Sequence, residues 1–107
     1  MIVFPDSFTV ARRKDIAGFA AQARIPCIYG WTEFVESGGL VSYGASNAES
    51  FKTLAVFVDK ILKGADASRI PIEQARNIKL TVNLPAATAL GLTVPQSIVS
   101  RADKLIE

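Results

Sequence analysis

Several residues of the chain have types and positions that suit contact with a small ligand. They end, or directly follow, three short apolar segments, and they are Asp6, Ser7, Tyr29, Trp31, Ser42, Tyr43 and Gly44. They offer a carboxylate for a cation, hydroxyls for hydrogen bonds, aromatic faces for stacking and a glycine that lets a ligand approach the backbone. This set favours binding of a small organic solute that carries an amine and a carboxylate, or a ring.

The segment over residues 38–44 is the most informative part of this set. A double glycine precedes an apolar strand that ends in Ser42, Tyr43 and Gly44. Such a strand brings its backbone close to a ligand while the tyrosine adds a flat face and a hydroxyl. A buried strand with ordinary turn glycines is the alternative interpretation. Tyr43 is the strongest single candidate for a ligand contact.

The other candidates also have plain structural interpretations. Asp6 and Ser7 could serve only as a turn or a helix cap, and Trp31 could serve only to pack against the helix that follows it. Asp6 after an apolar strand also invites comparison with the phosphoacceptor of receiver domains, but paired acidic residues that would hold magnesium are not evident near the chain start. A receiver-like enzyme is therefore the weaker hypothesis.

The composition argues against other enzyme classes. The chain has no histidine and one cysteine, Cys27, so a Ser-His-acid triad is excluded and a zinc site would lack ligands. No Gly-Lys-Ser/Thr sequence indicates a P-loop. We expect no catalytic residues, no metal and no cofactor. The mild net charge of +2 and the lack of aromatic residues among Arg12, Arg13 and Lys14 argue against a nucleic-acid partner.

The order of apolar segments and helical patterns predicts an α/β fold in one domain of 107 residues. We expect a layered, mostly parallel sheet flanked by helices. The predicted strands cover residues 2–4, buried on both faces, then 27–29, 40–43 and an edge or antiparallel strand at 78–84. The predicted helices cover residues 9–25 with Thr9 as a cap, 31–36 with Thr32 as N-cap, 46–63, 85–90 and 95–106, and a loop covers 65–76.

The helix over residues 46–63 is the firmest of these predictions. Ser46 and Glu49 form a capping box, and Gly64 marks the end of the helix. An apolar stripe runs along one side and consists of Phe51, Leu54, Ala55, Val58, Ile61 and Leu62. A small domain cannot leave this stripe in water, so we expect it to pack against the sheet of the same chain or against a second copy.

A succession of segments carries a resemblance to one family. They are RIPCIYG (24–30), EFVESGGLVSYG (33–44), VDKILKG (58–64), IPIEQ (70–74), NL (83–84) and ALGLTVP (89–95). Their order resembles the C-terminal portion of the substrate-binding components of ABC transporters, in a branch related to aromatic-amino-acid binders. The resemblance implies part of a type I periplasmic-binding-protein fold, a small polar or aromatic solute such as an amino acid, an ABC permease as partner and an extracytoplasmic location.

The same resemblance implies that the chain is only a part of such a receptor. Family members have two lobes and a secretion signal, whereas this chain matches about the last third. Met1 is followed at once by the apolar Ile2, so we expect no signal peptide. The alternatives to a solute-binding module are a self-associating assembly module, which would form a homo-oligomer through exposed apolar faces, and a small enzyme.

Overall fold

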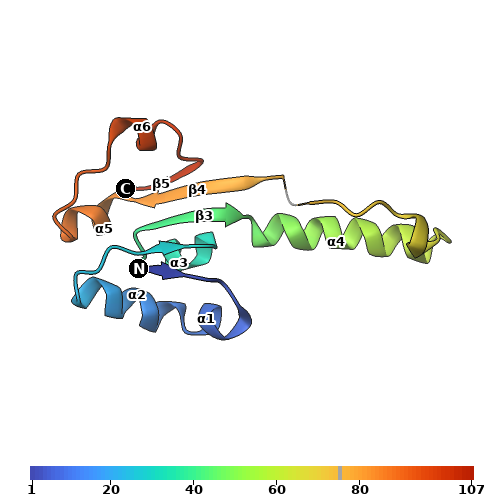
Figure 1. Cartoon of the computed structure of the whole chain (residues 1–107), viewed down its shortest axis with the longest axis horizontal. Helices are drawn as coiled ribbons and strands as arrows, with labels where there is room; N and C mark the ends of the chain where they lie inside the picture. Colours follow the sequence, from blue (N-terminus) through green and yellow to red (C-terminus); the bar gives the residue numbers. More distant parts are fainter. Residues whose placement is uncertain (75) are drawn as a thin grey trace.

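A computed structural model describes residues 1–74 and 76–107, and it contains a five-stranded sheet with a long helical arm (Figure 1). The strands β1 (Ile2–Val3), β2 (Ile28–Tyr29) and β3 (Val41–Ala45) are parallel. Strand β4 (Ile78–Asn83) is antiparallel to β3, and β5 (Lys104–Ile106) is parallel to β4. The strands lie side by side in the order of the sequence, which confirms the α/β fold with a mostly parallel sheet.

Helices connect the parallel strands, because a parallel pair needs a crossover rather than a tight turn. The connection from β1 to β2 contains α1 (Ser7–Ala11) and α2 (Arg13–Gln22), and that from β2 to β3 contains α3 (Thr32–Glu36). The connection from β4 to β5 contains α5 (Leu84–Ala89) and α6 (Gln96–Val99). The remaining connection, from β3 to β4, contains the arm helix α4 (Asn47–Leu62) and the short 3-10 helix η1 (Ala67–Arg69).

One face of the sheet is buried beneath helix α3. The strand register places Tyr29, Ser42 and Thr81 beside one another on this face, and each is at most 2% exposed. Phe34 of α3 stacks on Tyr29 with a ring-centroid distance of 5.0 Å. The hydroxyl oxygens of Thr32 and Thr81 lie 3.2 Å apart and share a hydrogen bond. This covered face, together with Ala20 of α2, forms the hydrophobic core.

The other face of the sheet is largely uncovered along its first strands. We call it the open face, and the register assigns to it Ile2, Ile28, Val41, Tyr43 and Ile78. Val82 of β4 lies on the same side but is only 2% exposed, so the face is uncovered along β1 to β3 and not along all of β4. Ile2 is 68% exposed and Tyr43 is 60% exposed. The expectation that the first strand is buried on both faces was therefore wrong, because the described residues place no helix over this side of β1.

Helix α4 leaves the sheet at the end of β3 and extends away from it, so that the molecule is 55 Å long (Figure 1). Its start and end were predicted well: the Ser46 hydroxyl accepts a hydrogen bond from the Glu49 amide at 3.3 Å, and Gly64 has a positive φ. The apolar stripe, however, is exposed, with Phe51 at 65% and Leu62 at 81%. Packing of the stripe on the sheet of the same chain is thus wrong, because the arm points away from that sheet.

Two helix caps differ from the prediction. Asp6 rather than Thr9 is the N-cap of the first helix, and the Thr9 hydroxyl instead accepts a hydrogen bond from the Asp6 amide at 2.9 Å, which completes a capping box. Thr32 is the first residue of α3 rather than its cap, because its hydroxyl is taken up by Thr81. One residue of the loop predicted over 65–76, number 75, lies outside the described residues.

The end of the chain also differs, since the helix predicted over residues 95–106 stops at Val99 and strand β5 follows. Asp103 explains the change. Its amide donates to the Leu80 carbonyl oxygen and its carboxylate accepts from the Leu80 amide, both at 2.8 Å. These bonds start the pairing of β5 with β4, and they make β4 an interior strand. The antiparallel alternative for β4 is confirmed and the edge alternative is wrong.

We expect Asp103→Ala to loosen β5, because the Leu80 amide loses a charged acceptor. The free energy of unfolding should fall by about 1 to 2 kcal/mol, and hydrogen exchange at the Leu105 and Ile106 amides should accelerate. Asp103→Asn keeps an acceptor oxygen and is the matched control. Equal exchange rates in the Ala variant and the wild type would contradict this role of Asp103.

Candidate functional site

The carboxyl ends of the three parallel strands meet at one edge of the sheet. We call this the carboxyl edge, and it is formed by Asp6 and Ser7 after β1, Gly30 and Trp31 after β2, and Tyr43 and Gly44 in β3. Ligands of open α/β sheets bind outside the carboxyl ends of the strands. The parallel pairing thus places the strand ends together, as the sequence predicted.

The backbone at this edge is tightly packed through two glycines. A Cβ atom on Gly44 would overlap the carbonyl oxygen of Gly30, and a Cβ atom on Gly30 would lie 2.6 Å from the Pro5 side chain. Only glycine fits at both positions without a shift of the backbone. The three strand ends are therefore in direct contact, and the end of β3 cannot move without affecting the loop that carries Trp31.

The two candidates after β1 lie at the start of helix α1. The Asp6 carboxylate caps this helix and accepts a hydrogen bond from the Thr9 amide at 2.7 Å, which lowers the pKa of Asp6. Ser7 is the first residue of the helix and is exposed. The capping interpretation of Asp6 is thus realised, while its ligand contact remains a prediction.

The aromatic and hydroxyl candidates divide between the two faces of the sheet. Tyr43 is exposed on the open face, and Trp31 is half-buried and packs against the core. Tyr29 and Ser42 are buried on the covered face, and in the described part of the chain neither hydroxyl has a hydrogen-bond partner. Burial raises the pKa of the Tyr29 phenol. Tyr43 is consequently the most accessible aromatic candidate of the original set.

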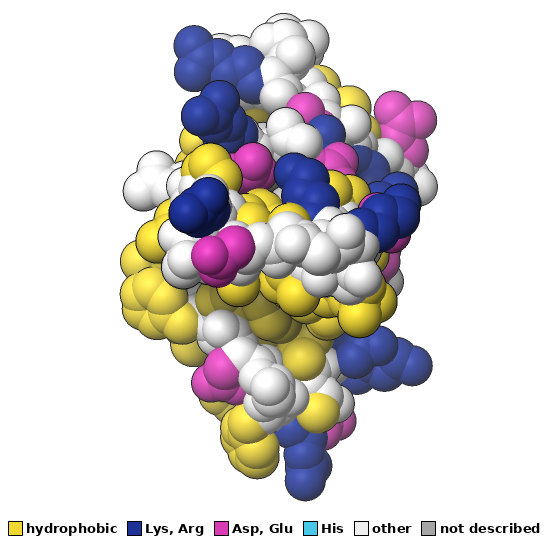
Figure 2. Space-filling model, turned by 90° about the vertical axis from the view of Figure 1, so that its right-hand side faces the viewer, with side chains coloured by type: hydrophobic (Ala, Val, Ile, Leu, Met, Phe, Trp, Pro, Cys, Tyr) yellow, Lys and Arg dark blue, Asp and Glu magenta, His cyan; other side chains and the backbone are white. Residues whose placement is uncertain are grey.

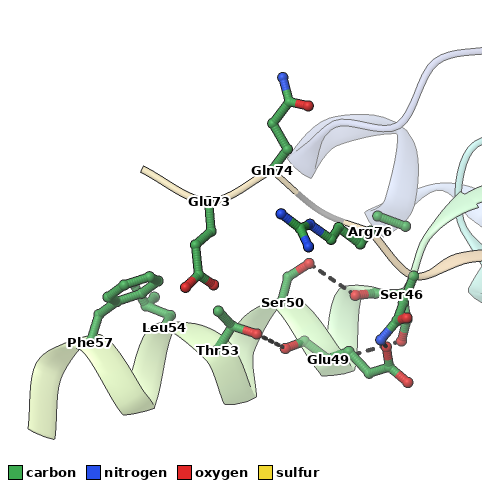
Figure 3. Close-up of a pocket in the computed structure, with 11 residues that line it drawn as sticks. Ser46, Glu49, Ser50, Thr53, Leu54, Phe57, Glu73, Gln74 and Arg76 are labelled. Carbon is green, nitrogen blue, oxygen red and sulfur yellow. Dashed lines mark hydrogen bonds between the residues drawn. The ribbon is translucent and has the colours of Figure 1, made fainter. Parts of the chain in front are cut away.

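A groove of about 520 Å³ begins where the carboxyl edge ends, and Figure 3 shows the residues that line it. It runs between the first half of α4 and the segment that returns to β4. The side chains of Glu73 and Arg76 extend over α4 from the returning segment, and Leu54 and Phe57 of α4 add apolar surface (Figure 3). The groove thus combines charges of both signs with an aromatic ring.

Glu49 fixes the inner end of this groove. Its carboxylate accepts a hydrogen bond from the Asn77 side-chain amide at 2.7 Å and lies 3.9 Å from the Lys79 ammonium. These contacts join the first turn of α4 to the start of β4. The arm is thereby held to the sheet at two places, namely the β3–α4 junction and the Glu49 contacts.

Sequence reasoning missed the groove residues Glu73 and Arg76. They lie in a segment without helical or strand periodicity, where charges read as solvated loop residues. Their approach to α4 depends on how the chain returns after η1, and no local pattern predicts that path. The described residues include no group of three or more His, Cys, Asp or Glu side chains that could hold a metal ion.

A second groove, of about 340 Å³, lies at the opposite end of the sheet. It runs between α2 and α5 and is lined mainly by small apolar side chains, among them Ala17, Ala20 and Ala86. Its lining is less polar than that of the groove beside α4. It offers fewer groups that could orient a polar solute, so we place the candidate site at the carboxyl edge.

Solved structures share this fold over nearly the whole chain. A conserved domain protein from Vibrio cholerae superposes with a TM-score of 0.89 at 26% identity, over 97% of this chain and 35% of that one. The ABC domain from Streptococcus pneumoniae in complex with L-Trp gives a TM-score of 0.84 at 24% identity, over 94% and 35% of the two chains. A ligand-free, open substrate-binding protein with adhesive properties from Clostridium difficile gives 0.64 at 22% identity, over 98% and 35%.

These likenesses define the class as an α/β domain of the periplasmic-binding-protein type. The family model for ABC transporter substrate binding proteins matches residues 1–106, so the chain belongs to that family. It is a family of binding proteins rather than of enzymes. The chain spans 35% of the length of each of the three solved relatives. A comparison with curated proteins gave no match.

The cap role of Asp6 predicts a pH dependence of stability. Because the folded pKa lies below the unfolded value of 3.8, the carboxylate stabilises the protein above that value and loses its effect as the pH falls through the folded pKa. Asp6→Asn keeps a good cap without this titration. We expect the variant to lose less stability than the wild type below about pH 4, measured by urea unfolding at several pH values. Identical pH profiles would contradict the prediction.

The glycine contact at the carboxyl edge predicts opposite effects for two alanine substitutions. Gly44→Ala should lower the free energy of unfolding by about 1 to 3 kcal/mol, because the new Cβ meets the Gly30 carbonyl. Gly18→Ala in α2 should raise it by about 0.5 to 1 kcal/mol, because that position is helical and has no atom within 4 Å of the new Cβ. Urea unfolding of both variants measures the difference, and a stabilised Gly44 variant would refute the close contact.

Proposed function

We propose that the chain is the C-terminal portion of a two-lobed solute-binding component of an ABC transport system. In this proposal the carboxyl edge binds a small polar or aromatic solute such as an amino acid. The observation that carries it is the meeting of three parallel strand ends beside the exposed Tyr43. Membership of the substrate-binding family supports the same conclusion.

The chemistry of the edge and the adjoining groove fits such a solute. Tyr43 presents an aromatic face on which a ring stacks. Arg76 and Glu73 add a cation for a carboxylate and an anion for an ammonium group at the groove beside α4. Trp31, Gly44, Asp6 and Ser7 are the further contacts that we propose at the carboxyl edge. The solved complex of the Streptococcus pneumoniae domain contains L-Trp, which makes an aromatic amino acid the first solute to test.

The location and the transport partner follow from the family in the same proposal. A binding component of this type works outside the cytoplasm and delivers its solute to an ABC permease. Among the described residues, no helix has the length and apolar character that crossing a bilayer requires. Because the chain spans 35% of its solved relatives, the permease contact and the second half of the solute site are expected from the remainder of the receptor.

Tyr43→Ala tests the proposed site directly. Loss of the stacking face should raise the Kd for L-Trp about 2- to 10-fold, since an aromatic contact is worth about 0.5 to 1.5 kcal/mol. Binding to the folded state raises Tm, so a thermal-shift titration with L-Trp and other amino acids gives the measurement. Phe19→Ala is the matched control, because Phe19 is an exposed aromatic residue of α2, 60% accessible and outside the carboxyl edge.

An unchanged Kd in the Tyr43 variant would remove this residue from the site. If the Tyr43→Ala and Phe19→Ala variants both bind L-Trp as tightly as the wild type, the solute binds elsewhere. The groove between α2 and α5 would then be the next candidate. No thermal shift with any amino acid in the wild type would refute solute binding by the chain on its own.

Self-association without retained solute binding is the second candidate function. The exposed apolar residues of α4 favour it, since Leu54 is 55% exposed and Leu62 is 81% exposed. Exposed apolar patches of this kind mark interaction surfaces. A homo-oligomer would cover them without any other partner.

A further inference from the structure

The width of the apolar stripe on α4 indicates what kind of surface covers it. The stripe residues are Phe51, Leu54, Ala55, Val58, Ile61 and Leu62, and Phe57 widens the stripe on one side. At 3.6 residues per turn these side chains occupy an arc of about 160° around the helix. A helix that pairs with one other helix needs only a narrow seam. A stripe of this width fits a broad, flat apolar surface such as the face of a β-sheet.

The open face of the sheet is a surface of this kind. Ile2, Ile28, Tyr43 and Ile78 are 68%, 37%, 60% and 42% exposed, and the register places them on one side. In a view along the arm, hydrophobic side chains form a broad band on one flank of the molecule (Figure 2). The chain therefore has two uncovered apolar surfaces, one on a helix and one on a sheet, which is the usual pair of layers in an α/β fold.

The two surfaces cannot meet within one chain, because α4 extends away from the sheet (Figure 1). We infer that two copies of the chain exchange their arms, so that α4 of each copy lies on the open face of the other. The exchange uses the same two surfaces in both directions and closes after two copies. Each copy thereby covers both of its exposed apolar surfaces with one kind of contact.

The polar side of α4 agrees with this arrangement. Lys52, Asp59 and Lys63 lie outside the apolar arc and stay in solvent when the arc is covered, and Lys63 pairs with Asp59 at 3.1 Å. Val56 is also outside the arc and is 53% exposed. It provides an apolar control position on the same helix.

The test is the mass of the 107-residue chain in solution, measured by light scattering after gel filtration. At about 100 µM, without any solute, we expect a dimer of twice 11.5 kDa. Leu62→Glu on the arm, outside the groove, and Ile28→Glu on the open face should each reduce the mass to that of one chain. Val56→Glu and Phe19→Glu place the same charge on exposed apolar positions outside both surfaces and should remain dimeric.

Two results would overturn the exchange. A wild-type chain that is monomeric at this concentration would overturn the exchange, and the two surfaces would then be expected to contact segments of the kind that the solved relatives have beyond the matched 35%. A dimer that Leu62→Glu dissociates but Ile28→Glu leaves intact would show that the arms pair with each other instead of with the sheet. Circular dichroism of every variant establishes that it is folded.

Disulfide trapping keeps the inference testable if a glutamate variant fails to fold. Under an added oxidant, a mixture of Leu62→Cys and Ile28→Cys chains should form disulfides between the two different variants. A mixture that forms only disulfides between identical chains contradicts the exchange. Tyr43 belongs both to the open face and to the proposed solute site, so an exchanged dimer covers Tyr43 and competes with the solute for it. No Tyr43 variant is used here, and a monomeric wild-type chain overturns the exchange while it leaves the solute site open.

Discussion

A sheet with apolar side chains on both faces is stable in water only when both faces are covered, and the connections of this chain cover one face fully and leave the other exposed along its first strands. The right-handed crossovers through α2 and α3 place their helices on the side of Tyr29 and Ser42, where the core forms. Ile2 and Ile28 on the other side keep large exposed fractions. The exposure of the first two strands follows from this one-sided coverage.

The same crossovers determine where chemistry is possible. Three parallel strands joined in order must end side by side, so the residues after each strand come together whatever their identity. Gly30 and Gly44 then allow the strand ends to touch through their backbones. What the edge offers a ligand depends on the side chains that remain accessible, and of its two aromatic candidates, Trp31 and Tyr43, Tyr43 is the more exposed. The strand pairing thus determines where the candidate site lies, and solvent exposure of the side chains makes Tyr43 the first candidate for a ligand contact.

Local patterns in the sequence were sufficient for most of this architecture. Apolar segments bounded by Gly and Pro predicted the parallel strands, and the Ser46 cap and Gly64 bounded the longest helix correctly. The helix predicted for residues 100–106 was wrong, because the apolar spacing there suits either a helix or a strand. The choice depends on hydrogen bonds with Leu80, which is distant in the sequence. The sequence did not predict Glu73 and Arg76 as groove residues for a similar reason, since only the path of the returning segment brings them to α4.

The burial of Tyr29 and Ser42 shows a further limit of such patterns. Both residues occupy positions that end apolar segments, which suggested a role at the edge, but strand alternation turns them to the covered face. Tyr43 is one residue beyond Ser42 and therefore points the opposite way. The difference between a core residue and an accessible one was thus a matter of strand phase, which depends on where the pairing begins.

The attachment of the arm gives it the properties of a lever. The chain enters α4 through Ala45 and Ser46 and returns through Asn77, and Glu49 cross-links the two passes within the first turn. A helix of 16 residues is about 24 Å long, so a tilt of a few degrees at this base displaces its tip by about 1 to 2 Å. Conversely, a force on the tip reaches Gly44 and, through its contact with Gly30, the loop of Trp31. A partner bound at the far end of α4 would thereby be connected, through Glu49 and Gly44, to the backbone of the carboxyl edge.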